Sequence, residues 1–102
     1  MAVFSQGDMI KIGNYKELFL VVSKNAFIKA TKVFHVCPLL PHVPEGPLHI
    51  KVCGNKGTGG VVLIEQVKMI DPAARRCSHK DRISYADIME VSDALQGIFE
   101  YD

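Results

Sequence analysis

The chain of 102 residues consists of short apolar stretches separated by turn-forming residues, and this feature constrains the fold most. The apolar stretches lie at residues 9–12, 18–23, 31–36, 48–52, 61–64 and 67–70. The segments of turn or loop composition lie at residues 13–14, 25–29, 41–47 and 54–60. Short strands at short spacing predict a mainly β fold, in which an antiparallel sheet curls into a small barrel over about residues 7–83.

The third stretch leads into Cys37-Pro38, which raises the question of where its strand ends. Proline has no N–H to donate to a sheet ladder, so the strand is expected to end or to reach an edge near Pro38. The rim that follows carries Leu39 and Leu40. Rims of small barrels usually present polar functional groups, so two leucines there are unusual for an enzyme.

The last segment has a helical period instead of a strand period. Ser84, followed three residues later by Asp87, is typical of a capping box at a helix start. An apolar stripe then follows, made of Ile88, Val91, Leu95 and Ile98. The sequence predicts one amphipathic helix over about residues 84–99 that packs against the barrel, with Phe99 and Tyr101 extending the contact. A partner-binding role for the stripe is the alternative.

Length and composition favour a single domain over residues 1–102, since a chain of this size buries one core without disulfides or metals. No apolar run approaches the roughly 18 residues of a membrane span, and no signal-peptide pattern is present. Cys37, Cys53 and Cys77 are widely spaced and form no Cys-x-x-Cys pair. We therefore expect a soluble cytoplasmic protein with no disulfide, metal or cofactor.

The small net charge of +1 conceals an uneven distribution. All twelve Lys and Arg residues lie within residues 1–84, together with six of the eleven acidic residues. Residues 85–102 carry the other five acidic residues and no cation. A basic body suits a polyanionic or acidic partner, although charge alone favours the alternative of a solvated mixed surface.

Five segments together resemble the MazF/PemK (mRNA interferase) toxins of type II toxin–antitoxin systems. The segments are GDMI at 7–10, LFLVVSKNAF at 18–27, TKVFHVCP at 31–38, GGVVLIEQVKMID at 59–71 and AARR at 73–76. Each is a short strand or turn, and their order and spacing carry the resemblance from residue 7 to the final helix. The resemblance implies an SH3-like barrel with a C-terminal helix, a homodimer, and an antitoxin protein as partner.

The family resemblance also implies cleavage of single-stranded RNA without metal, by attack of the ribose 2′-OH on the adjacent phosphate. In the family an Arg-Pro pair opens the second strand, and a Thr follows the Cys-Pro run of the third. Aligned on this chain, the Arg falls on Glu17 and the Thr on Leu40, and Lys16 is the nearest cation. We therefore expect weak or absent cleavage at Lys16, Glu17 and Leu40, with any residual activity dependent on Lys16.

Further expectations concern the surroundings of these positions. RNA contacts are expected from Lys16, Ser23, Lys24 and His42. Residues 18–23 and 31–36 are expected to be antiparallel neighbours, which would place Lys16 and Leu40 on one side of the barrel.

Two other functions remain open. The first is a noncatalytic module that keeps the barrel and holds RNA or an antitoxin. The second is a gyrase-directed poison, because the CcdB toxins share the fold. The poison is disfavoured, since CcdB toxins depend on a C-terminal Trp motif and this chain has no Trp and ends QGIFEYD.

Overall fold

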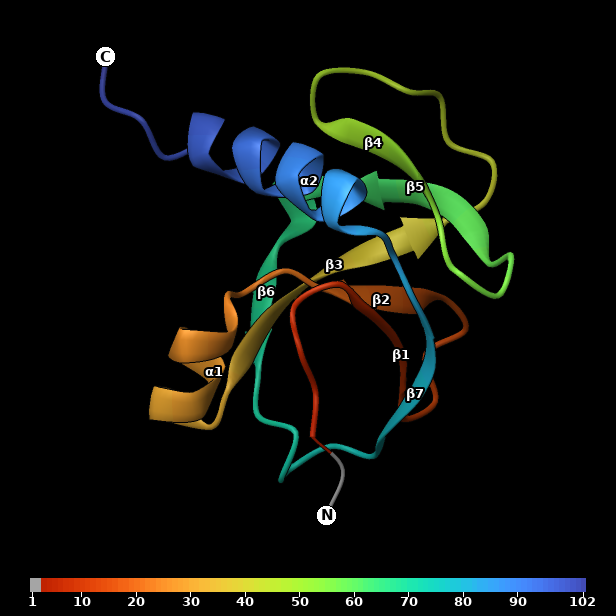
Figure 1. Cartoon of the computed structure of the whole chain (residues 1–102), viewed down its shortest axis with the longest axis vertical. Helices are drawn as coiled ribbons and strands as arrows, with labels where there is room; N and C mark the ends of the chain where they lie inside the picture. The colour runs from red at the N-terminus through yellow and green to blue at the C-terminus, as the bar shows by residue number, and fades with distance from the viewer. Residues whose placement is uncertain (1–2) are drawn as a thin grey trace.

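The structure is a computed structural model that describes residues 3–102 (Figure 1). Its elements are β1 (Asp8–Ile12), β2 (Leu18–Val21), α1 (Asn25–Thr31), β3 (Phe34–Leu40), β4 (His49–Cys53), β5 (Gly59–Leu63), the 3₁₀ helix η1 (Ile64–Gln66), β6 (Lys68–Ile70), β7 (Cys77–Arg82) and α2 (Tyr85–Gly97). Neither helix in this part of the chain is long and apolar enough to cross a membrane.

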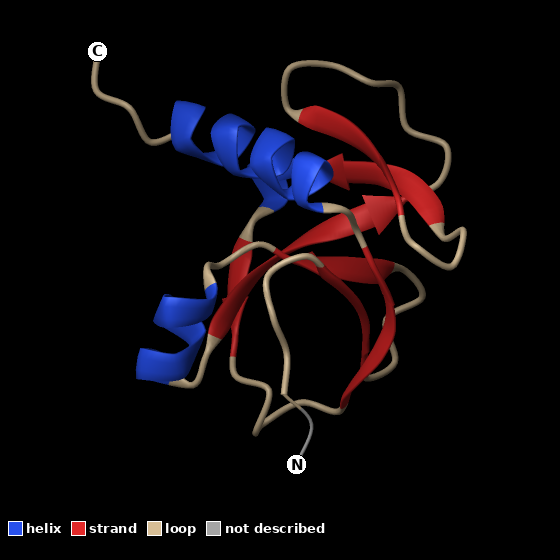
Figure 2. Cartoon of the chain, viewed as in Figure 1, coloured by secondary structure: helices blue, strands red, loops and turns tan. Residues whose placement is uncertain are grey.

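The seven strands form one antiparallel sheet with the order β4-β5-β3-β2-β1-β7, and β6 pairs with β3 (Figure 2). The sheet is strongly curved, and its two end strands approach one another without forming a ladder. An isolated bridge joins Gly54 to Ile83, and the Asn55 N–H donates to the Arg82 carbonyl at 2.9 Å. The predicted antiparallel fold with a C-terminal helix is confirmed, but the sheet is not closed into a barrel.

Strand β3 differs from its predicted course. It starts at Phe34 and runs through Pro38 to Leu40, instead of ending near Pro38. On one side β3 pairs with β6 over residues 34–36 and with β5 at Leu39 and Leu40. Pro38 lies between these two ladders, where β3 changes partner, so a strand can accommodate its missing N–H.

Residues 25–29, expected as a loop, belong instead to helix α1. The helix ends at Lys32, whose φ of 64° is left-handed and whose N–H donates to the Ile28 carbonyl at 2.8 Å. Thr31, expected in a strand, is therefore helical. A seven-residue helix with no fully buried side chain leaves little apolar periodicity in the sequence, which explains why it was missed.

Strand β7 was also missed by the sequence analysis. Its sequence, CSHKDR, is polar, and only Asp81 is fully buried. It is the last strand of the sheet, pairs with β1 alone, and turns most of its side chains to solvent. An edge strand of this kind carries neither the apolar run nor the alternation from which strands are recognised.

Two apolar cores lie on opposite sides of the sheet, because neighbouring strand residues alternate between its faces. One lies inside the curve and is built on Phe19, Phe34 and Ile10. The other includes Met9 and Leu20 and is covered by α2. Apolar side chains therefore pack against both faces of the sheet.

Helix α2 packs as predicted. Val91 is buried, and Ile88, Leu95 and Ile98 pack against the same core. The Ser84 hydroxyl accepts the Asp87 N–H at 3.2 Å, which is one half of the expected capping box. The expected contact of Tyr101 is wrong, since this side chain is exposed.

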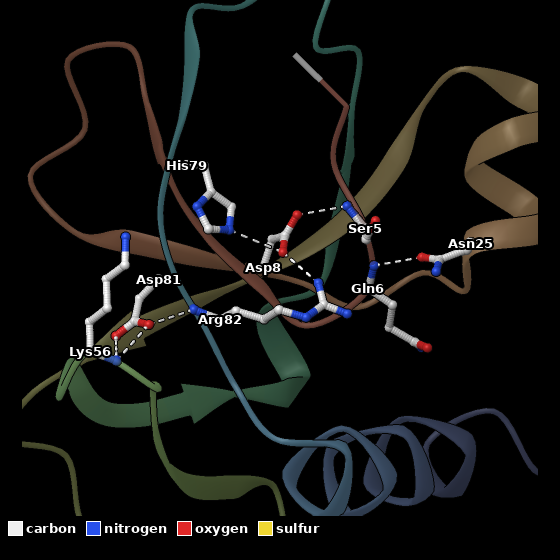
Figure 3. Close-up of polar contacts among 8 residues, drawn as sticks. All are labelled: Ser5, Gln6, Asp8, Asn25, Lys56, His79, Asp81 and Arg82. Carbon is white, nitrogen blue, oxygen red and sulfur yellow. Dashed lines mark hydrogen bonds and ion pairs between the residues drawn. The ribbon is translucent and has the colours of Figure 1, made fainter.

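A buried carboxylate fastens the β4–β5 loop to β7 (Figure 3). Asp81 accepts the backbone N–H groups of Lys56 at 3.0 Å, Thr58 at 3.1 Å and Arg82 at 2.7 Å. Gly54 lies directly beneath it, where a Cβ would stand 2.1 Å from Asp81 Oδ2. The β4–β5 loop is therefore held against β7 by this side chain as well as by the backbone contacts of Gly54 and Asn55.

Candidate functional site

The family-equivalent positions meet at one end of β2 and β3. These strands are antiparallel neighbours, as expected, and Leu18 pairs with Leu39. Glu17 and Leu40 each lie one residue beyond that pair, and both are half-buried. Lys16 is exposed in the β1–β2 loop beside them. The register thus brings the three expected residues to a common edge, which offers one cation, one carboxylate and one apolar side chain.

The expected RNA contacts are divided between the two ends of β2. His42 is exposed in the loop two residues after Leu40, on the side of the common edge. Ser23 and Lys24 follow the opposite end of β2, about 20 Å of extended chain from Glu17. These six residues therefore do not form one site within a single chain.

Ser23 has a structural role at its end of the sheet. Its Oγ accepts the backbone N–H of His35 at 2.6 Å and lies 2.9 Å from His35 Nδ1. The Phe27 ring packs on this imidazole with centroids 5.3 Å apart. The serine hydroxyl thus continues the contact between β2 and β3 beyond their ladder.

A cluster of two cations, Lys68 and Arg75, and two aromatic rings, Tyr15 and Phe19, extends the edge that contains Lys16. The Lys68 ammonium lies 4.4 Å from the centroid of the Tyr15 ring and 4.8 Å from that of Phe19. Lys68 Nζ also donates to the Tyr15 hydroxyl at 3.3 Å, and the Tyr15 and Phe19 rings meet edge to face at 5.2 Å. The cluster joins three segments that are distant in sequence.

The charge of this cluster acts on Tyr15. The hydrogen bond and the positive charge of Lys68, followed by those of Arg75, hold the pKa of the Tyr15 hydroxyl below its usual value. The two cations can bind a phosphate, and the exposed Tyr15 ring can stack on a base. Sequence reasoning missed these residues as a site, although Lys68 and Arg75 fall in two of the segments that carry the family resemblance.

Two of the three cysteines, Cys37 and Cys77, are held as unreactive thiols. Burial raises the pKa of Cys37 to about 12, and burial also raises the pKa of Cys77. Both thiols therefore stay protonated at neutral pH. Within residues 3–102, no group of His, Cys, Asp and Glu side chains is arranged to hold a metal ion.

The fold and the cationic edge define a small antiparallel β protein with a surface suited to a polyanion. The model of one known protein family, the PemK-like, MazF-like toxins of type II toxin–antitoxin systems, matches residues 8–99 of the chain. The chain therefore belongs to this toxin family. No curated protein is similar enough in sequence to match.

Several solved structures share the fold. MazE–MazF from Deinococcus radiodurans (Form-II) has a TM-score of 0.84 at 20% identity, with 100% of both chains covered. Form-I of this complex has a TM-score of 0.82 at 22% identity, with 96% of this chain and 97% of that one covered. A mycobacterial endoribonuclease in complex with its cognate antitoxin has a TM-score of 0.80 at 13% identity, with 98% and 100% covered. At these identities the likeness shows the fold.

Proposed function

We propose that this toxin is a cytoplasmic homodimer that binds single-stranded RNA and an antitoxin protein, with an inherited cleavage edge that is weak or inactive. The observation that carries the proposal is the pairing of Leu18 with Leu39, which aligns Glu17 with Leu40. Where the family has a guanidinium and a hydroxyl, this edge has a carboxylate and an alkyl group. A carboxylate repels the phosphate, and an alkyl group offers no hydrogen bond to it.

Lys16 compensates for this loss only in part. Its ammonium is a single point charge, whereas a guanidinium holds two phosphoryl oxygens in a planar fork. RNA binding therefore rests on the cations around Tyr15, and cleavage at the edge lacks its donors. The chemistry at this edge favours a polyanion-binding surface over an efficient nuclease centre.

The double variant Glu17→Arg with Leu40→Thr tests this proposal. Each missing donor commonly costs about 10²- to 10³-fold in rate, so the variant is expected to cleave single-stranded RNA at least about 10²-fold faster than the natural chain. Lys16→Ala should remove any slow cleavage that occurs at this edge. Efficient cleavage by the natural chain at a rate that the double variant does not raise would contradict the proposal.

The proposed antitoxin contact follows from charge and from the apolar side chain of Leu40 at the same edge, whereas Leu39, expected beside it on the rim, is buried in the core. Antitoxins of the similar complexes are separate chains, and an acidic segment with apolar side chains suits a basic body with the half-buried Leu40 at its edge. Raising the salt from about 50 mM to about 500 mM should weaken such a complex, since the Debye length shrinks severalfold. An affinity independent of salt would exclude charge as its determinant.

The proposed homodimer is supported by an apolar groove between the sheet and the end of α2. The groove has a volume of about 210 Å³ and is lined by Val22, Ser23, His35, Val67, Leu95 and Phe99. The Phe99 side chain is 74% exposed, and Met69, which pairs with His35 across β6 and β3, is also exposed. A second copy that covers this surface would bury on the order of 1,200–2,000 Å² in total.

A further inference from the structure

We propose that Asp8, His79 and Arg82 form a second phosphodiester-cleaving centre, separate from the edge formed by Lys16, Glu17 and Leu40. The inference rests on the proposed function in one respect, which is that RNA is the substrate. It goes beyond that function because it assigns residual cleavage to residues of β1 and β7. None of these three residues takes the place of the family's Arg or Thr.

An irregularity in the ladder between β1 and β7 creates the cluster. Met9 pairs with Asp81, but the next residue, Ile10, pairs with His79. Lys80 is therefore an extra residue, as in a β-bulge, and such bulges redirect the side chains around them. As a result, Asp81 points into the protein, while His79 and Arg82 both reach Asp8 at the start of β1.

Asp8 is the buried member of the cluster, with a side chain only 5% exposed. Its Oδ1 accepts from Arg82 Nη1 at 2.6 Å and from His79 Nε2 at 3.2 Å (Figure 3). Its Oδ2 accepts the backbone N–H of Ser5 at 2.7 Å. These contacts hold the carboxylate in one orientation, so it acts as a positioning residue for the other two.

His79 has the orientation of a general base. Because Nε2 donates its proton to Asp8, the neutral ring carries its lone pair on Nδ1, which points away from the carboxylate. The side chain is 44% exposed, so a ribose hydroxyl can approach this nitrogen. The fixed tautomer and ring plane are what a base needs to take a proton in one defined direction.

Arg82 supplies the charge that a phosphodiester requires. Only Nη1 of its guanidinium donates to Asp8, and the side chain is 42% exposed. The remaining N–H groups of the fork match two non-bridging phosphate oxygens. Lys80 on the bulge and Lys56 on the adjacent loop are exposed cations that add attraction for a polyanion along β7.

The reaction needs no redox partner. His79 Nδ1 takes the proton of the ribose 2′-OH, and the 2′-oxygen forms a bond to the adjacent phosphorus. The bond from phosphorus to the 5′-oxygen breaks, that oxygen takes a proton from water, and His79 later returns its proton to the solvent. Arg82 stabilises the negative charge of the pentacoordinate phosphorane. The products are a 2′,3′-cyclic phosphate and a 5′-hydroxyl.

The test uses the full chain with a mixed-sequence single-stranded RNA in the presence of EDTA, and DNA of the same sequence beside it. We expect slow cleavage of the RNA with cyclic phosphate ends and none of the DNA. His79→Ala should lower the rate by about 10²- to 10⁴-fold, and His79→Gln, which keeps a donor to Asp8, should lower it equally.

His49→Ala is the matched control, because His49 also contacts a carboxylate, at 3.1 Å, but that of the exposed Glu65. It should cleave at the natural rate. Cleavage that persists in both His79 variants, or a natural chain that binds RNA without cleaving it, would overturn this inference and leave the proposed RNA binding intact. A natural chain that does not bind RNA would overturn both.

Discussion

The backbone N–H of Thr58 donates to Asp81 Oδ2 at 3.1 Å, and this contact joins the β4–β5 loop to the opposite end of the sheet. Burial alone would raise the pKa of Asp81, but the N–H groups of Arg82, Lys56 and Thr58 outweigh it and lower the pKa to about 2. The ionised carboxylate therefore takes the place of a ladder between β4 and β7. Together with the Gly54–Ile83 bridge and the hydrogen bond from Asn55 N–H to the Arg82 carbonyl, this charge holds the ends of the open sheet together.

Asp81→Asn should lower stability in a manner that depends on pH. A carboxyl group whose pKa is lowered on folding stabilises the protein above its unfolded value of 3.8, and that contribution is lost as pH falls through about 2. The variant should therefore unfold at lower urea concentration at pH 7, and the difference should shrink towards pH 2. Asp93→Asn, on the exposed side of α2, is the control and should change little at either pH.

Gly7→Ala should destabilise the fold by about 1–3 kcal/mol. Gly7 has a φ of 95°, and a Cβ there would lie 2.6 Å from Ile88 Cδ1 on α2. The substitution thus imposes backbone strain and also displaces the Ile88 side chain, which packs α2 against its core. Gly97→Ala is the matched control, since no atom lies within 4 Å of its Cβ and its φ is not positive. Urea unfolding of the two variants measures the difference, and equal midpoints would contradict the steric argument.

The fold was predictable wherever buried side chains repeat with a regular period. β1, β2 and α2 have apolar residues that face a core, and the sequence shows them within one or two residues of their true bounds. The polar edge strand β7 and the short exposed helix α1 carry no such period. Their places are fixed by tertiary hydrogen bonds such as those of Asp8 and Asp81, which local sequence does not encode.

The candidate site was predictable only in part, for a related reason. Glu17 and Leu40 could be placed together because the strands that carry them were recognisable. Tyr15, Lys68 and Arg75 come from two loops and a three-residue strand, and their proximity depends on the register of three separate ladders. His79 and Asp8 depend in addition on the bulge at Lys80. Sequence patterns show which faces of a strand or helix are buried, but they do not show which side chains from distant segments come close in the folded sheet.

The Tyr15 hydroxyl should ionise at lower pH than an isolated tyrosine. Lys68 and Arg75 stabilise the phenolate, which lowers its pKa from 10.0. Ultraviolet titration of the chain should show one early component among its three tyrosines, and Tyr15→Phe should remove it. Lys68→Met should shift this component back towards 10.0. An unchanged titration in Lys68→Met would mean that the ammonium does not contact the hydroxyl in solution.

Lys68→Ala and Arg75→Ala should each weaken binding of single-stranded RNA and make it less dependent on salt. A cation that contacts one phosphate releases about one counterion, so its loss should reduce the slope of log affinity against log salt by about 0.7. Lys51→Ala, on the exposed face of β4, serves as the control because it removes equal charge at a distance from Tyr15. Equal slopes for all three variants would show that the attraction is general and not local to this cluster.

Phe99→Asp should convert the proposed homodimer into a monomer. The Phe99 ring lines the apolar groove with Leu95 and Val67, so a carboxylate there would be buried against a second copy without a counter-charge. Sedimentation at micromolar concentration measures the effect. Tyr85→Asp is the matched control: Tyr85 is 75% exposed, as Phe99 is 74% exposed, but it stands at the start of α2 and does not line the groove. If the dimer survives Phe99→Asp but dissociates with Tyr85→Asp, the interface lies at the other end of α2. If the natural chain sediments as a monomer, the homodimer is excluded.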